Sequence, residues 1–175
     1  MSVSAALAVA PEAELIGSID ERIDALELAI IEFTDVIEPN VEHVFTPGLY
    51  RRTLRAPAST IPGTVTIGTT YIHKQEHQFV VTKGVVLVSH GDGNWLRVEA
   101  PYYGITKVGT RRICIVIEDA EWSTFHPTTL TDIDEVEREL FEFRTLPDGT
   151  NVQDRFRAAL KAKMLSGELQ KEIEP

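Results

Sequence analysis

Two histidines, at positions 73 and 77, are the residues of this sequence best suited to chemistry. A neutral imidazole binds transition metals and exchanges protons near neutral pH. In an extended strand, His73, Gln75 and His77 would point to one face, because successive side chains alternate. A third imidazole, His126, ends the β-rich segment 122–126. If that segment turns its histidine inward, three imidazoles would face one interior.

The spacing of the two histidines decides what they can do together. Residues four apart on a regular strand lie about 13 Å apart along the backbone. His73 and His77 can therefore reach one metal only if the strand bulges or bends near Gln75 and Glu76. With such a bend, His126 completes a set that would suit Zn, Fe, Mn or Ni. The regular strand, which we favour, predicts two separate hydrogen-bonded histidines. The expected cofactor is thus either none or one divalent transition metal.

The elements that must position these residues are short and β-rich. Glycine and proline punctuate them, and their regular spacing predicts a closed barrel or a sandwich. The segments are 63–68, 79–81, 85–89, 95–98 and 111–117, with further strands at 49–54 and 122–126. We place this β domain at residues 44–130.

Helices are expected on both sides of the β domain. A heptad pattern of apolar residues predicts an amphipathic helix in an acidic N-terminal arm, residues 1–43. The pattern comprises Ile16, Ile19, Ile23, Leu26, Ile30, Phe33 and Ile37. Such a helix either packs across its own barrel or joins chains, and we expect a homo-oligomer or larger assembly through it. A C-terminal helical region, 131–175, should hold a helical pair, capped by Thr131 with Asp134 and by Asn151 with Asp154.

Composition excludes several classes of function. The net charge is −10, with −9 in residues 1–48, +3 in 49–126 and −4 in 127–175. An acidic chain without a basic stripe is a poor candidate for nucleic-acid binding. No apolar run approaches the roughly 20 residues that span a bilayer. The N-terminal segment lacks the basic region of a secretory signal. A single cysteine, Cys114, fits a reducing compartment and a buried position.

Several motifs of this sequence resemble those of a known family. The run from Gly68 to Gly84, the pair Ala100-Pro101 and the run Val108-Gly-Thr-Arg-Arg112 resemble the two-motif signature of the cupin superfamily. The order of motifs over about residues 44–143 is similar to that of small cupin-like proteins encoded by tailed bacteriophages. The resemblance implies a cupin-type β-barrel (jelly roll). It also implies the cytoplasm of a host cell, or a virion, as the location.

The resemblance also implies where a metal site would lie. Metal-binding cupins take two histidines and a glutamate from the first motif and a histidine from the second. Aligned on the turn glycine, His73 falls at the second histidine and Tyr71 replaces the first. His77 stands at the glutamate and Arg112 near the last histidine. The candidate metal ligands are therefore His73 and His77, with His126 as a third if its strand turns it inward. The candidate ligand-binding residues are Arg112, Gln75 and Tyr71.

The two arginines at 111 and 112 add a constraint. Neighbours on a strand face opposite ways, so only one can line the barrel. The motif alignment places Arg112 inside and Arg111 outside, paired with an acid such as Glu118 or Asp119. A guanidinium cannot ligate a metal, and beside a cation it costs energy unless an anion lies between them. An anionic organic ligand held without metal by His73, His77 and Arg112 is therefore an alternative.

Two functional classes remain open. One is a structural or interaction protein, such as a phage particle component or assembly factor, with a degenerate metal site. The other is a metal-dependent cupin enzyme acting on a small polar or anionic substrate. The substituted ligand set and the apolar seam of the N-terminal helix favour the first class.

Overall fold

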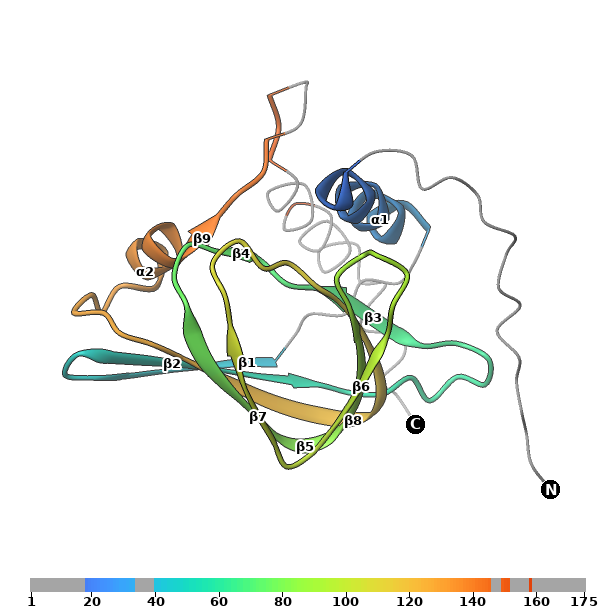
Figure 1. Ribbon diagram of the computed structural model, residues 1–175, viewed down its shortest axis with the longest axis horizontal. Helices are drawn as coiled ribbons and strands as arrows, with labels where there is room; N and C mark the ends of the chain where they lie inside the picture. The colour runs from blue at the N-terminus through green and yellow to red at the C-terminus, as the bar shows by residue number, and fades with distance from the viewer. Residues whose placement is uncertain (1–17, 34–39, 146–148, 152–157, 159–175) are drawn as a thin grey trace.

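The computed structural model describes residues 18–33, 40–145, 149–151 and 158 (Figure 1). Two α-helices flank a mainly antiparallel β structure, as the sequence predicts. The elements are α1 (Ile19–Phe33), β1 (Asn40–Thr46), β2 (Leu49–Ala56), β3 (Thr66–Thr69), β4 (Ile72–His73), β5 (His77–Ser89), β6 (Leu96–Glu99), β7 (Tyr102–Thr106), β8 (Ile113–His126), α2 (Ile133–Leu140) and β9 (Phe141–Glu142).

The two long strands, β5 and β8, form the frame of the barrel. They pair with each other along most of their length, and other strands flank each half. The first half of β5 lies between β7 and the end of β8, where β2 and then β1 continue the sheet. The second half of β5 lies between β6 and the start of β8, which β3 extends. The strands curl into a ring around the interior (Figure 1).

A glycine allows β5 to turn the corner between these halves. Gly84 has φ +81, and a Cβ there would collide with the backbone carbonyl of Asp119 on β8. The pairing of β5 with β8 changes register three times between Val81 and Val86, as bulged strands do where they bend. Only glycine fits this combination of left-handed backbone and close approach.

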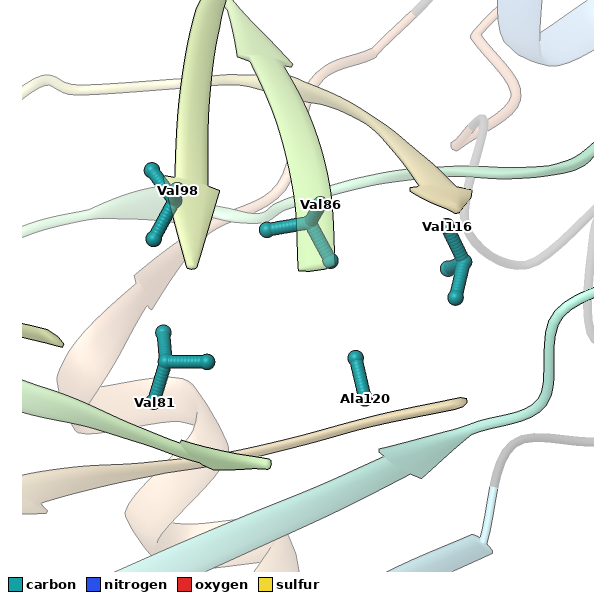
Figure 2. Close-up of a cluster of buried hydrophobic side chains, with 5 residues drawn as sticks. All are labelled: Val81, Val86, Val98, Val116 and Ala120. Atoms are coloured by element: carbon teal, nitrogen blue, oxygen red, sulfur yellow. The ribbon is translucent and has the colours of Figure 1, made fainter. Parts of the chain in front are cut away.

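The barrel interior holds a small aliphatic core. Its buried members come from β5, β6 and β8: Val81, Val86, Val98, Val116 and Ala120 (Figure 2). β-branched valines favour extended strands and pack well on a pleated surface. Cys114 is buried too, and burial raises its pKa to about 11, so the thiol is a core residue as predicted.

Helix α1 packs against its own chain. Ile23 and Ile30 are buried, with exposed fractions of 0% and 9%, and Ile19 and Ile23 lie against the hairpin glycine Gly91. The helix also buries two of its acidic residues, Asp24 and Glu27. Ile16 and Ile37 lie outside the described residues. Association of copies through this helix stays a prediction.

Helix α2 confirms the first of the two expected C-terminal helices, with a shifted cap. Asp132 is the N-cap, and its side chain accepts from the Glu135 backbone N–H at 3.0 Å. The predicted cap, Thr131 with Asp134, was therefore wrong by one residue. The expected second helix lies almost entirely outside the described residues. Among the residues that are described, no helix is long and apolar enough to cross a membrane.

Candidate metal centre

The chain breaks between the two histidines that the sequence places on one strand. His73 ends β4, which pairs with β9, and His77 begins β5, which pairs with β7. The Lys74 backbone N–H donates to the Leu140 carbonyl at 2.8 Å, which extends the contact of β4 with the β9 segment by one residue. The prediction of a regular strand from His73 to His77 is therefore wrong. The two strand ends pair with different partners, which forces the bend that the sequence left as the alternative.

This bend brings three imidazoles together. The ring centroids of His73 and His77 lie 4.1 Å apart, and those of His77 and His126 lie 4.4 Å apart. His73 and His126 stack with a centroid distance of 5.8 Å. One nitrogen from each ring can be chosen so that all three lie within 4.8 Å of one another. All three side chains are buried.

The three imidazole rings make few hydrogen bonds, so some of their nitrogen atoms remain able to bind a metal. His77 Nδ1 lies 3.4 Å from the Gln75 carbonyl, and His126 Nε2 lies 3.0 Å from the Thr124 hydroxyl. Nδ1 of His73 and Nδ1 of His126 are buried and have no hydrogen-bond partner among the described residues. Burying such a nitrogen without a partner costs free energy. A bound cation would offset that cost.

Burial keeps these imidazoles neutral. Desolvation, helped by the neighbouring imidazoles and by Arg112 and Arg52, lowers the pKa of His73 to about 2. The same cause, with His77 and Arg52, lowers the pKa of His126 to about 3. Desolvation and the Arg112 charge also lower the pKa of His77, against the hydrogen bond to Gln75. A neutral imidazole is the form that ligates a metal.

Aromatic rings surround the three imidazoles. Phe141 of β9 meets His73 edge-on at a centroid distance of 5.0 Å and His126 at 6.2 Å. Tyr50 of β2 stacks on His126 at 5.9 Å, and its hydroxyl lies 2.7 Å from His43 Nδ1. Burial raises the pKa of Tyr50 to about 12, so the phenol stays protonated. Aromatic rings thus line one side of the three buried imidazoles.

The donor set fits a divalent transition metal. Three nitrogens that bind one Zn²⁺ tetrahedrally at 2.0–2.1 Å lie about 3.4 Å from one another. The present nitrogen spacing, within 4.8 Å, needs a closure of about 1 Å or a little more to reach that geometry. Small rotations of the three rings cover such a distance. Three imidazoles also leave one coordination position free.

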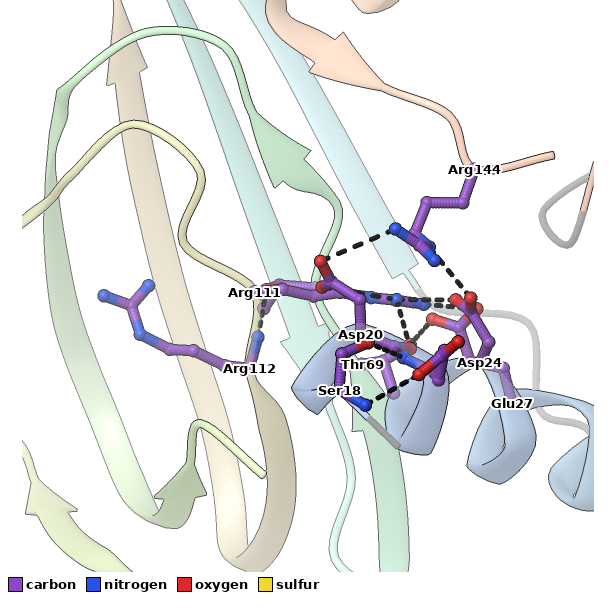
Figure 3. A network of polar contacts seen from close by, with 10 residues as sticks. Ser18, Asp20, Asp24, Glu27, Thr69, Arg111, Arg112 and Arg144 are labelled. Carbon is purple, nitrogen blue, oxygen red and sulfur yellow. Dashed lines mark hydrogen bonds and ion pairs between the residues drawn. The ribbon is translucent and has the colours of Figure 1, made fainter. Parts of the chain in front are cut away.

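The adjacent arginines face opposite ways, and both precede β8 (Figure 3). Arg111 is buried at 3% exposure, and its ion-pair partners lie on α1. Its Nη1 lies 2.6 Å from Asp24 and its Nη2 2.9 Å from Glu27. The expected pairing of Arg111 with Glu118 or Asp119 is therefore wrong, because α1 docks against this arginine.

Arg112 points into the barrel, as expected. Its Nη1 donates to the Thr106 hydroxyl at 3.0 Å, and its guanidinium lies 5.7 Å from the centre of the Phe79 ring. Thr106 is 1% exposed and is paired directly with His77 across β5 and β7. Desolvation lowers the pKa of Arg112, which still carries its charge.

Two other predicted ligand-binding residues take different positions. Tyr71 joins the aromatic wall, with its ring 4.8 Å from that of Phe141. The Gln75 side chain turns outward to Glu139 of α2 at 3.5 Å, while its carbonyl faces His77. Tyr71 thus contacts Phe141, which in turn meets His73 and His126, and the Gln75 amide points away from the imidazoles.

Sequence reasoning missed two residues of β2, Tyr50 and Arg52. Tyr50 is paired with His126 across β2 and β8, and the Arg52 guanidinium lies 5.9 Å from the centre of the Phe141 ring. The sequence predicted the strand at 49–54, on which alternation places these two residues on one face. Nothing in the sequence indicated that β2 lies beside the strand of His126.

Comparisons with known proteins give the chain no established relative. No protein-family model matches it. A search of curated proteins also finds no match. Three similar solved structures are cupin proteins, and all are distant. A cupin-2 domain protein from Shewanella frigidimarina is 9% identical, covering 65% of this chain and 95% of that one, with a TM-score of 0.39.

The cupin domain of Cnp3 from Schizosaccharomyces pombe is 15% identical, covering 62% and 71% of the two chains, with a TM-score of 0.41. An RmlC-like cupin from Methanocaldococcus jannaschii is 13% identical, covering 54% and 84%, with a TM-score of 0.38. The resemblance to phage-encoded cupins stays a prediction.

Proposed function

We propose that this protein binds one divalent transition metal through His73, His77 and His126. The observation that carries the proposal is the convergence of three buried imidazoles from three strands, with ligand atoms within 4.8 Å of one another. Hydrogen bonding within the barrel does not explain why these histidines are buried together, since the Nδ1 atoms of His73 and His126 lack partners among the described residues. Zn, Fe, Mn and Ni all accept imidazole ligands.

The metal centre favours the second of the two functional classes, a metal-dependent barrel acting on a small polar or anionic substrate. A metal held by three neutral imidazoles keeps its full charge and would supply Lewis acidity at its free coordination position. The residues of the chain hold the imidazoles in place and exclude water, through Phe141, Tyr50 and Tyr71. A structural or assembly role, including a place in a phage particle, stays a prediction.

The test is metal content per chain. The full-length protein is stripped with a chelator, dialysed against Zn²⁺ or Co²⁺ and analysed by plasma mass spectrometry. We expect one metal per chain, and a loss of most of it in His73→Ala/His77→Ala and in His126→Ala. The matched control is His90→Ala, because His90 is an exposed histidine in the loop after β5. Equal metal in the wild type and in the folded triad variants would refute the proposal.

A further inference from the structure

Two arginines near the three imidazoles differ from the other arginines of the barrel. Arg51, Arg55, Arg97, Arg111 and Arg144 each form an ion pair with a carboxylate. Arg52 and Arg112 form none with any carboxylate of the described residues, although both are half-buried. Half-buried guanidinium groups are costly without a counter-charge. Their position indicates where a negative charge should bind.

Arg112 lies beside the proposed metal ligand His77. Its guanidinium is bonded to Thr106, and Thr106 is the cross-strand partner of His77. Directly opposed residues on antiparallel strands have Cβ atoms about 5 Å apart. One Arg112 nitrogen is taken by the threonine. The guanidinium carries further N–H donors for a ligand.

Arg52 approaches from the aromatic side of the three imidazoles. It is two residues from Tyr50 on the same face of β2, and Tyr50 stacks on His126. The Arg52 guanidinium lies 5.5 Å from the Tyr71 ring centre and 5.9 Å from that of Phe141. Its Nε is buried and has no hydrogen-bond partner among the described residues.

These charges add up when the metal is bound. A divalent ion on three neutral imidazoles, with two guanidinium groups beside it, brings four positive charges into a mostly apolar site. Within the described residues, neither guanidinium forms an ion pair such as those that the buried Arg111 forms with Asp24 and Glu27. The buried Glu137 acts on the same residues, His43 and Tyr50, as Arg52 does, and it balances at most one of the four charges. A guanidinium tolerates a nearby metal when an anion lies between them. The aromatic walls further suit a ligand with an apolar part.

We propose that the metal centre takes a small organic carboxylate as its ligand. The carboxylate would occupy the free coordination position and accept hydrogen bonds from Arg112 and Arg52. Its hydrocarbon part would contact the surrounding aromatic rings. This inference rests on the proposed metal site and names the class of ligand that the site binds.

The experiment uses the full-length protein loaded with Co²⁺, whose visible absorption reports on its ligands. Propionate is titrated, with neutral propionamide and inorganic phosphate as comparison probes. We expect a saturable spectral change with propionate, and a Kd raised at least tenfold in Arg112→Gln and in Arg52→Gln. Arg112→Lys, which keeps the charge, should lose less affinity. Arg97→Gln, at an exposed arginine paired with Glu99, is the matched control and should bind as the wild type does.

Several results would overturn the inference. They are equal propionate affinity in both glutamine variants, equal response to propionamide, or tighter binding of phosphate than of propionate. Co²⁺ content is measured in every sample, so a variant that keeps its metal and loses propionate supports the inference. A wild-type protein that fails to bind Co²⁺ would refute the metal site itself. Calorimetry would then measure propionate binding to the metal-free protein. Binding that depends on the two arginines would support a carboxylate site, and no binding would overturn it.

Discussion

Acidification should destabilise the metal-free protein well above the pH at which carboxylates protonate. His73 and His126 are buried, and their pKa values fall to about 2 and about 3 in the folded state. In the unfolded chain each returns to about 6.5. Between pH 7 and pH 5 the unfolded chain therefore binds protons at these two positions that the folded chain does not.

The sign and size follow from proton linkage. Stability rises with pH wherever the unfolded state binds more protons, so the free energy of unfolding must fall as the pH is lowered from 7 to 5. Each histidine that stays neutral in the fold contributes a loss of about 2 kcal/mol over that window, given an unfolded pKa of about 6.5. The two together give about 4 kcal/mol, and the folded pKa values need only lie below 5. A typical domain has about 5–15 kcal/mol in all.

Urea denaturation in the presence of a chelator measures this loss. We expect the wild-type free energy of unfolding to drop by at least about 4 kcal/mol from pH 7 to pH 5. In His73→Gln/His126→Gln the drop should shrink by about 4 kcal/mol, which leaves the contribution of His77, whose pKa is also lowered. His90→Gln, at an exposed histidine, should keep the wild-type drop. Equal wild-type stability at the two pH values, or an equal drop in the double variant, would show that these imidazoles are not held neutral by burial.

Further predictions concern the elements around the site. Arg111→Gln should cost about 3–5 kcal/mol in urea denaturation because it leaves buried acids unpaired, whereas exposed Arg97→Gln should cost about 0–1 kcal/mol. Equal costs would refute a stabilising role for the ion cluster. Gly84→Ala should destabilise more than Gly93→Ala, since both have positive φ but only Gly84 faces a backbone carbonyl. The predicted homo-oligomer is checked by light scattering, where a monomeric mass unchanged by Ile23→Asp would defeat association through α1.

Local pattern predicted both described helices and most barrel strands, but not β1, β7 or β9. The spacing of apolar residues in α1 and the β-branched runs of the barrel strands can be recognised in the sequence alone. Recognising them does not require knowing which element packs against them. Each of the two long strands was expected as two segments, β5 as 79–81 and 85–89, and β8 as 111–117 and 122–126. In the structure Asp119 stays in the strand, with Lys83 of β5 3.7 Å away.

The site depended on pairings between distant segments, which a single sequence does not show. His73 and His77 meet because β4 pairs with β9, at residues 141–142. Arg111 pairs with Asp24, 87 residues away, because α1 docks on the barrel. The histidines could be recognised in the sequence, but the bend that brings them together depends on strand pairing between distant segments.

The central claim is that three histidine rings bind one metal. X-ray absorption spectroscopy of Zn²⁺-loaded protein tests this directly, because imidazole rings give recognisable outer-shell scattering. We predict three imidazoles with Zn–N distances of about 2.0–2.1 Å. The count should fall to two in His126→Ala if that variant still holds zinc. A spectrum with one imidazole or none, or with sulfur scattering from Cys114, would contradict the account.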